Sequence, residues 1–323
     1  MNKVFVLVFS IVLFTSCKQA AKVQNKEEKV VIVPGFNADS AYQYIKNQVD
    51  FGPRVPNSPS HKLCAAYLSA SLKSFGANVI EQKAELKAYN GIILKSTNII
   101  GSYNIESKTR ILLCAHWDSR PISDHDSNPQ NFDKPVLGAN DGASGVGVLL
   151  EMARVFGKNT PSVGIDIVFF DAEDYGAPEN FVGVSENSWC LGSQYWSANP
   201  HVSGYAAKYG ILLDMVGAPN ATFYKEQISM SYAPDVVNNV WSTARNLGFS
   251  QYFINENGGG ITDDHLYVNK IAGIPCIDII HFNPNSEHGF GDFWHTVNDT
   301  MDNIDKNTLF AVGTTLMNVV YKE

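Results

Sequence analysis

Gly164-Ile-Asp-Ile-Val-Phe-Phe-Asp-Ala-Glu-Asp174 is a short apolar run that ends in a cluster of acidic residues. A continuous apolar run of this length predicts a strand buried on both faces, over residues 164–170. The same pattern predicts buried strands at residues 110–114, 211–215 and 274–280. Each of these strands has a carboxylate or an imidazole within it or just after it. The strand ends are therefore where we expect a functional site.

Apolar residues recur at helical spacing in the segments between these strands. We expect helices at residues 40–49, 64–75, 146–156, 234–247 and 308–320, and two further strands at 78–80 and 97–102. Three prolines within residues 51–60 predict an ordered, non-helical loop. Short buried strands that alternate with helices predict an α/β fold, in which a central, mostly parallel, twisted sheet is flanked by helices. We find no internal repeat, and no linker after residue 35, so we expect one domain.

The composition narrows the class of protein. The chain has 323 residues, 45% of them hydrophobic and 17% charged, which is typical of a globular protein. Its 24 Lys and Arg against 32 Asp and Glu give a net charge of −8, and no basic cluster is present. Because phosphate binding needs a basic face, this balance argues against a nucleic-acid partner. No apolar run after the N-terminal segment is long enough to predict a membrane span.

The first seventeen residues have the pattern of a targeting signal. A basic start at Met1-Asn-Lys3 is followed by an apolar run to Phe14 and then by Thr15-Ser-Cys17. Phe-Thr-Ser-Cys resembles the processing box of bacterial lipoproteins, in which the cysteine carries the lipid. This resemblance implies a lipoprotein signal peptide at residues 1–17, a flexible tether at 18–35 and a catalytic domain at 36–323. The alternative is a plain signal peptide with an incidental Cys17.

Under the lipoprotein interpretation, the chain is an exported bacterial lipoprotein that is anchored to a membrane and faces the periplasm or the cell surface. Four other cysteines remain, too few for a disulfide framework in a chain of this length. Cys114 and Cys276 lie in apolar strands, so we expect them to be buried thiols. Whether Cys64 pairs with Cys190 stays open.

Several acidic and imidazole side chains could converge at the carboxyl ends of the strands, where ligand sites of open α/β sheets form. A cluster of carboxylates and imidazoles suits a metal, with zinc as the leading candidate. Glu173 and Asp174 are adjacent, so they point different ways, and one can bind metal while the other handles protons. The candidates are His116, Asp141, Glu173, Asp174, Asp214, Asp263 and His295.

Other residues of the same types have simpler interpretations. We expect structural roles for the four aspartates Asp124, Asp126, Asp171 and Asp278. Three histidines in polar segments are expected at the surface, namely His61, His125 and His201. His281 and His288 are left undecided.

These motifs resemble a known family. His116-Trp-Asp118, Asn140-Asp-Gly142, Glu173-Asp174, Asp214 and His295 together resemble the zinc-dependent aminopeptidase superfamily, which implies a three-layer sandwich fold and one or two zinc ions. Within it, the segments 212–220, 262–265 and 293–296 are similar to glutaminyl cyclases (glutaminyl-peptide cyclotransferases). Segments 171–176 and 189–196 resemble the bacterial branch.

The resemblance implies roles for individual residues. Asp141, Asp174 and His295 would hold a single zinc. Glu173 and Asp263 would be catalytic, with Glu173 as the proton shuttle. Asp214 and Trp294 would bind the substrate. His116, Asp118 and His265 would be second-metal ligands or would support the site from behind. Position 174 is Asp where animal cyclases have Glu.

The resemblance implies that peptides or proteins with an N-terminal glutamine are converted to pyroglutamyl products with release of ammonia. One alternative is an aminopeptidase with two zinc ions, in which His116 and Asp214 hold the second metal and Asp141 bridges both. A further alternative is a non-catalytic, peptide-binding surface lipoprotein. The sequence retains Glu173 and His295, which disfavours a non-catalytic role.

Overall fold

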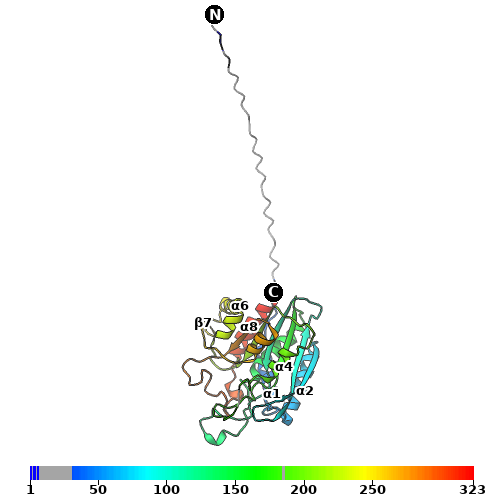
Figure 1. Cartoon of the computed structure of the whole chain (residues 1–323), viewed down its shortest axis with the longest axis vertical. Coiled ribbons are helices and arrows are strands. Elements are labelled where there is room, and N and C mark those ends of the chain that lie inside the picture. The colour runs from blue at the N-terminus through cyan, green and yellow to red at the C-terminus, as the bar shows by residue number, and fades with distance from the viewer. Residues whose placement is uncertain (2, 5, 7–30, 184–185) are drawn as a thin grey trace. The chain divides into compact units, whose positions relative to one another are not determined.

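The structure is a computed structural model that describes residues 1, 3, 4, 6, 31–183 and 186–323. Its compact unit runs from Ile32 to Glu323 (Figure 1). Cys17 and most of the expected signal peptide and tether lie outside the described residues. No helix in the described part of the chain is both long enough and apolar enough to cross a membrane.

Six strands form the central sheet, in the order β1-β2-β4-β3-β5-β8. The four strands β4, β3, β5 and β8 are parallel neighbours, whereas β1 and β2 are antiparallel. A mostly parallel core of the sheet therefore carries an antiparallel edge. The strands are β1 (Asn78–Lys87), β2 (Ile93–Tyr103), β3 (Arg110–His116), β4 (Gly164–Phe170), β5 (Tyr209–Asp214) and β8 (Cys276–Ile280).

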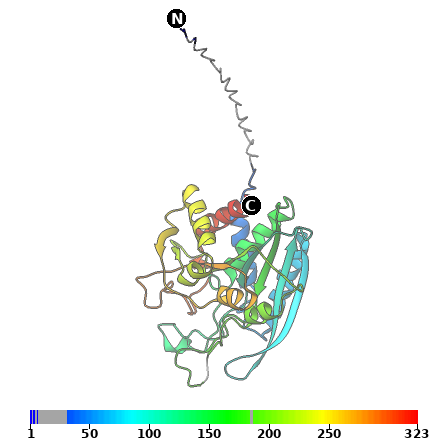
Figure 2. The ribbon, with the colours of Figure 1, turned by 45° about the horizontal axis from the view of Figure 1, so that its top comes forward.

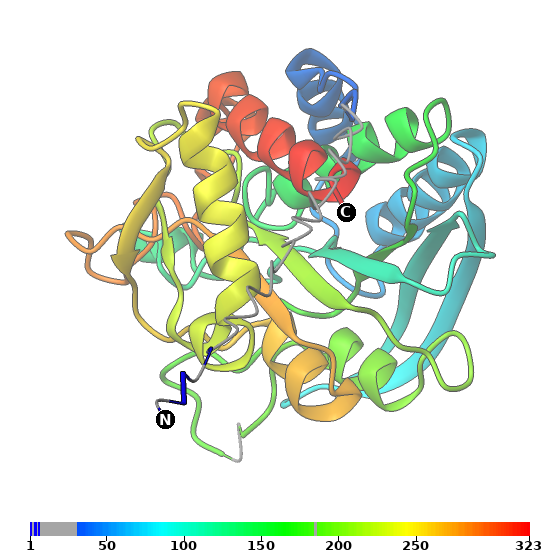
Figure 3. The same cartoon turned by 90° about the horizontal axis from the view of Figure 1, so that it is seen from above.

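Both faces of this sheet are covered, because successive residues of a strand point to opposite sides and both sets are apolar. On β3, Ile111 and Leu113 join the larger core, whereas Leu112 and Cys114 join the smaller core on the other face. The three layers, helices on each side of the sheet, are visible in Figure 3.

The larger core is covered by five long helices, and the smaller one by short helical segments (Figures 2 and 3). The five are α1 (Ala38–Val49), α2 (Pro59–Ser74), α3 (Ala143–Phe156), α6 (Pro234–Asn246) and α8 (Lys306–Tyr321). The short segments are α4 (Leu191–Ala198), α7 (Asp264–Tyr267) and the π-helical turn η2 (Val268–Ala272). The remaining elements are α5 (Gln227–Tyr232), the two-stranded sheet of β6 (Phe223–Lys225) and β7 (Phe253–Asn257), and the 3₁₀ turns η1 (Pro129–Asn131) and η3 (Met301–Asn303).

Helix α3 lies unusually close to the sheet, and this closeness brings Asp141 to the strand ends. A Cβ atom on Gly145 would lie 2.2 Å from the carbonyl oxygen of Leu213 in β5, so only glycine allows this approach. The preceding Gly142 has φ +91°, a conformation that side chains other than glycine rarely adopt. The chain can therefore turn sharply after Asp141 and enter the helix directly.

The predicted elements form, with differences at their ends. Strand β4 covers the predicted residues 164–170, but β1 is much longer than the predicted 78–80 because it is an edge strand with alternating charged residues rather than an apolar run. Helix α2 begins at Pro59, five residues before the predicted start, because Ser58 caps it and proline suits the first helical position. The short elements α4, α5, α7, β6 and β7 were not predicted, since each is too short to show a period.

Candidate active site

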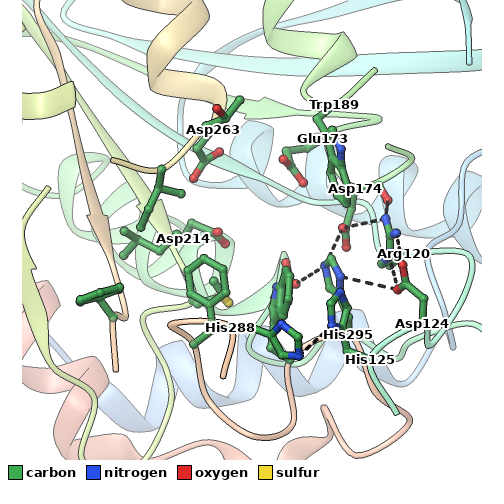
Figure 4. Close-up of a pocket in the computed structure, with 18 of the residues that line it drawn as sticks. Arg120, Asp124, His125, Glu173, Asp174, Trp189, Asp214, Asp263, His288 and His295 are labelled. Carbon is green, nitrogen blue, oxygen red and sulfur yellow. Dashed lines mark hydrogen bonds and ion pairs between the residues drawn. The ribbon is translucent and has the colours of Figure 1, made fainter. Parts of the chain in front are cut away.

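The carboxyl ends of the parallel strands form the floor of one cavity of about 480 Å³ (Figure 4). Strands β3 and β5 end at His116 and Asp214, and the turn after β4 carries Glu173 and Asp174. Three loops complete the set: Asp141 precedes α3, Asp263 caps α7, and His295 follows β8. The seven residues that the sequence predicted to converge are therefore brought together at this edge.

Asp141, Asp174 and His295 form a set that could hold a metal. Each offers one ligand atom, and these atoms lie within 4.8 Å of one another. Nε2 of His295 is 3.1 Å from Oδ1 of Asp174 and 3.5 Å from Oδ2 of Asp141. All three residues are buried, and one imidazole with two carboxylates is a donor set that zinc accepts. The residues present therefore fit a zinc ion.

His116 lies in a second, adjoining set. Its Nε2 is 3.0 Å from Oδ1 of Asp141 and 3.1 Å from Oδ1 of Asp214. Burial acts to raise the pKa of Asp141, but the hydrogen bonds from His116 and His295 outweigh burial and lower it. Burial raises the pKa of Asp214 to about 7. This set can act in either of two ways, as a hydrogen-bonded imidazole between two acids or as a second metal site.

Glu173 and Asp263 form an acidic wall on the other side of the cavity (Figure 4). Burial raises the pKa of Glu173 well above its ordinary value, against the pull of His116 and together with the charge of Asp174. Burial also raises the pKa of Asp263. A carboxyl group whose pKa is raised holds a proton more readily than an ordinary one, which is a property of groups that transfer protons in active sites.

The adjacent Glu173 and Asp174 point apart, Asp174 toward His295 and Glu173 toward Asp263 (Figure 4). Asp118 holds the turn, because its carboxylate accepts the backbone N–H groups of Glu173 at 3.1 Å and Asp174 at 3.3 Å. Ala172 before them has φ +55°, a strained value for a non-glycine residue. The two neighbouring carboxylates are thereby directed to different partners.

Aromatic and cationic side chains wall the cavity around His295. Trp294 stacks on the imidazole with a centroid distance of 3.8 Å, and Trp189 lies parallel to it at 5.9 Å. The guanidinium of Arg120 is 4.5 Å from the Trp189 ring and is paired with Asp124. Of these residues, the sequence predicted a site role for Trp294 alone. Asp124 is only four residues from Arg120, but the contacts of Arg120 with the Trp189 ring and with the carbonyl of Asp174 join distant segments that no local pattern shows.

The three histidines expected at the surface are not surface residues, and these expectations are wrong. His61 is buried, stacks on Trp117 and lies 2.9 Å from Asp171. His125 is half-buried and lines the cavity beside Trp294, and the side chain of His201 is only 2% exposed. Distant aromatic residues pack on His61 and His125, whereas His201 packs on Trp196 and Tyr205, which lie within five residues of it.

The two undecided histidines, His281 and His288, and the supporting candidate His265 lie in different places. His288 lines the cavity and lies 3.2 Å from His125, whereas Nδ1 of His281 accepts the backbone N–H of Thr222 behind it. His265 is fully buried behind Asp263, with Nε2 3.2 Å from Glu226.

Of the four aspartates expected to be structural, Asp126 and Asp171 accept backbone N–H groups, and Asp278 is buried beneath the cavity. Asp124 instead lines the cavity, with Oδ1 3.7 Å from Nδ1 of His295, which corrects the expectation for this residue.

The thiols follow the expectations. Cys114 and Cys276 are buried and free, and Cys64 and Cys190 are also free, so they do not pair.

Two residues that the sequence did not point to support Asp141 from behind. Asp299 accepts the backbone N–H groups of Asn140 at 2.8 Å and Asp141 at 3.0 Å. Arg54 is fully buried and donates to the carbonyl oxygens of Trp117 and Gly138. Arg54 is 84 residues from Gly138, and Asp299 is 158 residues from Asp141, so no local pattern could show these contacts.

Known proteins resemble the chain over most of its length. The profile of peptidase family M28 matches residues 98–320. The solved structure of the glutaminyl cyclase of Bacteroides thetaiotaomicron bound to N-acetylhistamine is 57% identical, with a TM-score of 0.89 over 90% of this chain and 100% of the other. A Zn-dependent exopeptidase of Parabacteroides distasonis is 57% identical, with a TM-score of 0.90 and the same coverage. The glutaminyl-peptide cyclotransferase of Bos taurus is 25% identical over 79% of this chain and 74% of its own.

The contacts of Asp299 generate a prediction. We expect D299A to weaken zinc binding roughly tenfold to hundredfold, because residues that orient metal ligands have effects of this size. Competition with a chelator measures the affinity. D302A is the matched control, since Asp302 is exposed. An unchanged affinity in D299A would show that Asp299 does not orient Asp141.

Proposed function

The chain belongs to peptidase family M28, and from this membership we propose that it is a zinc-dependent glutaminyl cyclase, which converts the N-terminal glutamine of peptides or proteins to pyroglutamate and releases ammonia. One observation carries the proposal. A zinc-type donor set and the acidic pair of Glu173 and Asp263 share one cavity, in a chain 57% identical to a solved glutaminyl cyclase. These relatives favour an enzyme over a non-catalytic peptide-binding lipoprotein.

We assign one zinc ion to Asp141, Asp174 and His295. Bound there, zinc would supply Lewis acidity to the γ-carbonyl of the substrate glutamine. Position 174 is Asp where animal cyclases have Glu. We still assign Asp174 as a zinc ligand, because its Oδ1 lies 3.1 Å from Nε2 of His295. Arg120 and Asp124 steady that imidazole from the side away from the metal set.

The reaction joins two parts of one residue, so its reactants are already linked. The free α-amine attacks the γ-amide carbon, a C–N bond forms to close the five-membered ring, and the bond to the amide nitrogen breaks. Glu173 takes a proton from the attacking amine and returns it to the departing nitrogen, which leaves as ammonia. The protein need only hold the side chain in the bent, reactive geometry. No water enters the products.

The lining of the cavity suits such a substrate. Asp214 and Asp263 offer carboxylates to the α-amine, and Trp294 supplies a flat apolar wall against which the folded side chain can lie. Phe282 and Phe290 also line the cavity and offer apolar surface to the residues that follow the glutamine. An amine-binding acidic end and an apolar wall favour a peptide N-terminus over an anionic substrate.

An aminopeptidase with two zinc ions is the second candidate. His116, Asp141 and Asp214 each place a ligand atom within 4.8 Å of the others, which provides for a second metal. The 57% identical relative described as a Zn-dependent exopeptidase also favours it. In that case Glu173 would activate a water molecule that attacks the first peptide bond.

We also propose that the enzyme is an exported lipoprotein, anchored to a membrane through Cys17. The proposal is supported by the order of a basic start, an apolar run and a cysteine in residues 1–17. Export would place the enzyme with peptides that leave the cell, whose free N-termini are its proposed substrates.

The first experiment separates the two activities. The chain without residues 1–17 is incubated with a Gln-Ala peptide and with a Leu-Ala peptide, and masses and zinc content are measured. We expect the glutamine peptide alone to lose about 17 Da, the mass of ammonia, with about one zinc per chain. Release of the first residue from either peptide, with about two zinc ions, would instead identify an aminopeptidase.

Glu173 can be tested without disturbing the metal. We expect E173Q to lower kcat at least 10²-fold, the lower end for loss of general acid–base catalysis, while zinc stays bound, because the amide keeps the shape but cannot shuttle a proton. D174A is the contrasting variant and is expected to lose both zinc and activity. Turnover near the wild-type rate in E173Q would remove Glu173 from this role.

The anchor is tested in cells. In a bacterial host that lipidates proteins, we expect the full chain to fractionate with membranes and C17A to lose this fraction, because the lipid is attached through the thiol. Incorporation of a labelled fatty acid measures the attachment directly. A wild-type chain that takes up no label would leave the plain signal peptide as the explanation.

A further inference from the structure

Cys190 begins a clamp on the turn that carries Glu173. Its backbone N–H donates to the carbonyl of Glu173 at 2.9 Å, and that of Leu191 donates to the carbonyl of Ala172 at 3.0 Å. Gly192 packs so tightly on the end of β4 that a Cβ atom there would lie 2.0 Å from the carbonyl oxygen of Asp171. The start of α4 therefore fixes the backbone beneath Glu173.

The side chain of Cys190 also contacts Glu173. The thiol is fully buried, and Sγ lies 3.2 Å from Oε1 of Glu173 and within 4.8 Å of a carboxylate oxygen of Asp263. The other oxygen of Glu173, Oε2, is 3.9 Å from Nδ1 of His116. Burial and the nearby charge of Glu173 raise the pKa of Cys190 well above its ordinary value, so the thiol keeps its proton and can donate it.

A fixed carboxylate matters because the terminal torsion of glutamate is broad and has no single preferred value. The clamp places the backbone of Glu173, but it leaves this torsion free. Cys190 supplies a donor at one oxygen, and the proposed reaction does not otherwise use it. The backbone of Cys190 is itself held at φ +58°, which aims the side chain at Glu173 at the cost of strain.

We propose that Cys190 is a positioning residue, whose thiol donates a hydrogen bond to Oε1 of Glu173 and thereby presents Oε2 to the amine of the substrate. This inference rests on the proposed function, because it assigns Glu173 the proton transfer. A role in packing alone is the competing explanation, since Cys190 also packs with Trp189, Leu266, Tyr267 and Ile228. Packing alone would affect stability, whereas positioning affects kcat and depends on the donor.

The test compares C190A with C190S on the Gln-Ala peptide. We expect C190A to lower kcat roughly tenfold to hundredfold, the range for a lost hydrogen bond to a charged group, with KM and zinc content little changed. C190S keeps a donor at nearly the same place, so we expect it to restore kcat to within several-fold of wild type. Valine is avoided because a β-branched residue is poorly tolerated at positive φ. C276A, which removes a buried thiol from the smaller core, is the control and should keep the wild-type kcat.

Either of two kinetic results overturns the inference: wild-type kcat in C190A, or C190S as slow as C190A. A second measurement needs no turnover. The infrared S–H stretching band that disappears in C190S should lie at lower frequency than the band that disappears in C276A, because the Cys190 thiol donates to a carboxylate. An unshifted band overturns the inference, even in an active enzyme. Absence of cyclisation by the wild type overturns the proposed function instead, and the band still decides the hydrogen bond.

Discussion

Crowding of buried carboxylates at one edge of the sheet is the constraint on which the site depends. Asp141, Glu173, Asp174, Asp214 and Asp263 line one cavity. Two like charges 4 Å apart repel by about 4 kcal/mol at an effective dielectric constant near 20, so five charges cannot share this space uncompensated. His116 and His295 lie between the acids, and the buried cations Arg54 and Arg120 lie behind them. Burial also raises the pKa values of Glu173, Asp214 and Asp263, which favours their protonated, uncharged forms. A metal ion bound among the acids, as proposed, would supply further positive charge.

Such crowding persists only because the backbone around it is held in place. Ala172, Cys190, Met215 and His295 all have positive φ, which costs free energy at non-glycine residues, and each lies at or beside the cavity. Buried polar groups offset this cost by fixing the turns: Asp118 binds the turn after β4, and Asp299 binds the turn before α3. The cores on the two faces of the sheet support these turns. Rigidity of the strand ends therefore places ligands and proton-transfer groups within ångströms of one another.

The sequence predicted the strands and the long helices because their apolar residues recur at short, regular spacing. It predicted the convergence of seven polar residues from their positions relative to the strands. Apolar runs such as 164–170 show a buried strand without any partner, and the rule that strand ends meet at one edge then brings Glu173 and Asp214 together. The sequence did not reveal Arg54, Arg120, Trp189 or Asp299. Arg54 and Asp299 hold backbone groups far along the chain, and Arg120 and Trp189 meet each other only in the folded protein. The expectation that His61 and His125 lie at the surface is wrong because distant segments cover them. Their sequence neighbours are polar, and only the folded chain brings Trp117 and Trp294 against their rings.

The amino-acid order by itself determined the α/β class, the position of each acidic residue relative to its strand, and the inventory of zinc-type ligands. These follow from hydrophobic period and residue chemistry, which are properties of short segments. Tertiary structure alone decided which acids are neighbours, which way each carboxylate points and how burial shifts its pKa. It also decided that the Cys190 thiol contacts Glu173, because the two residues are 17 positions apart and no local pattern predicts their contact. Those properties depend on distances and on exclusion of water, and both arise only when remote segments pack together.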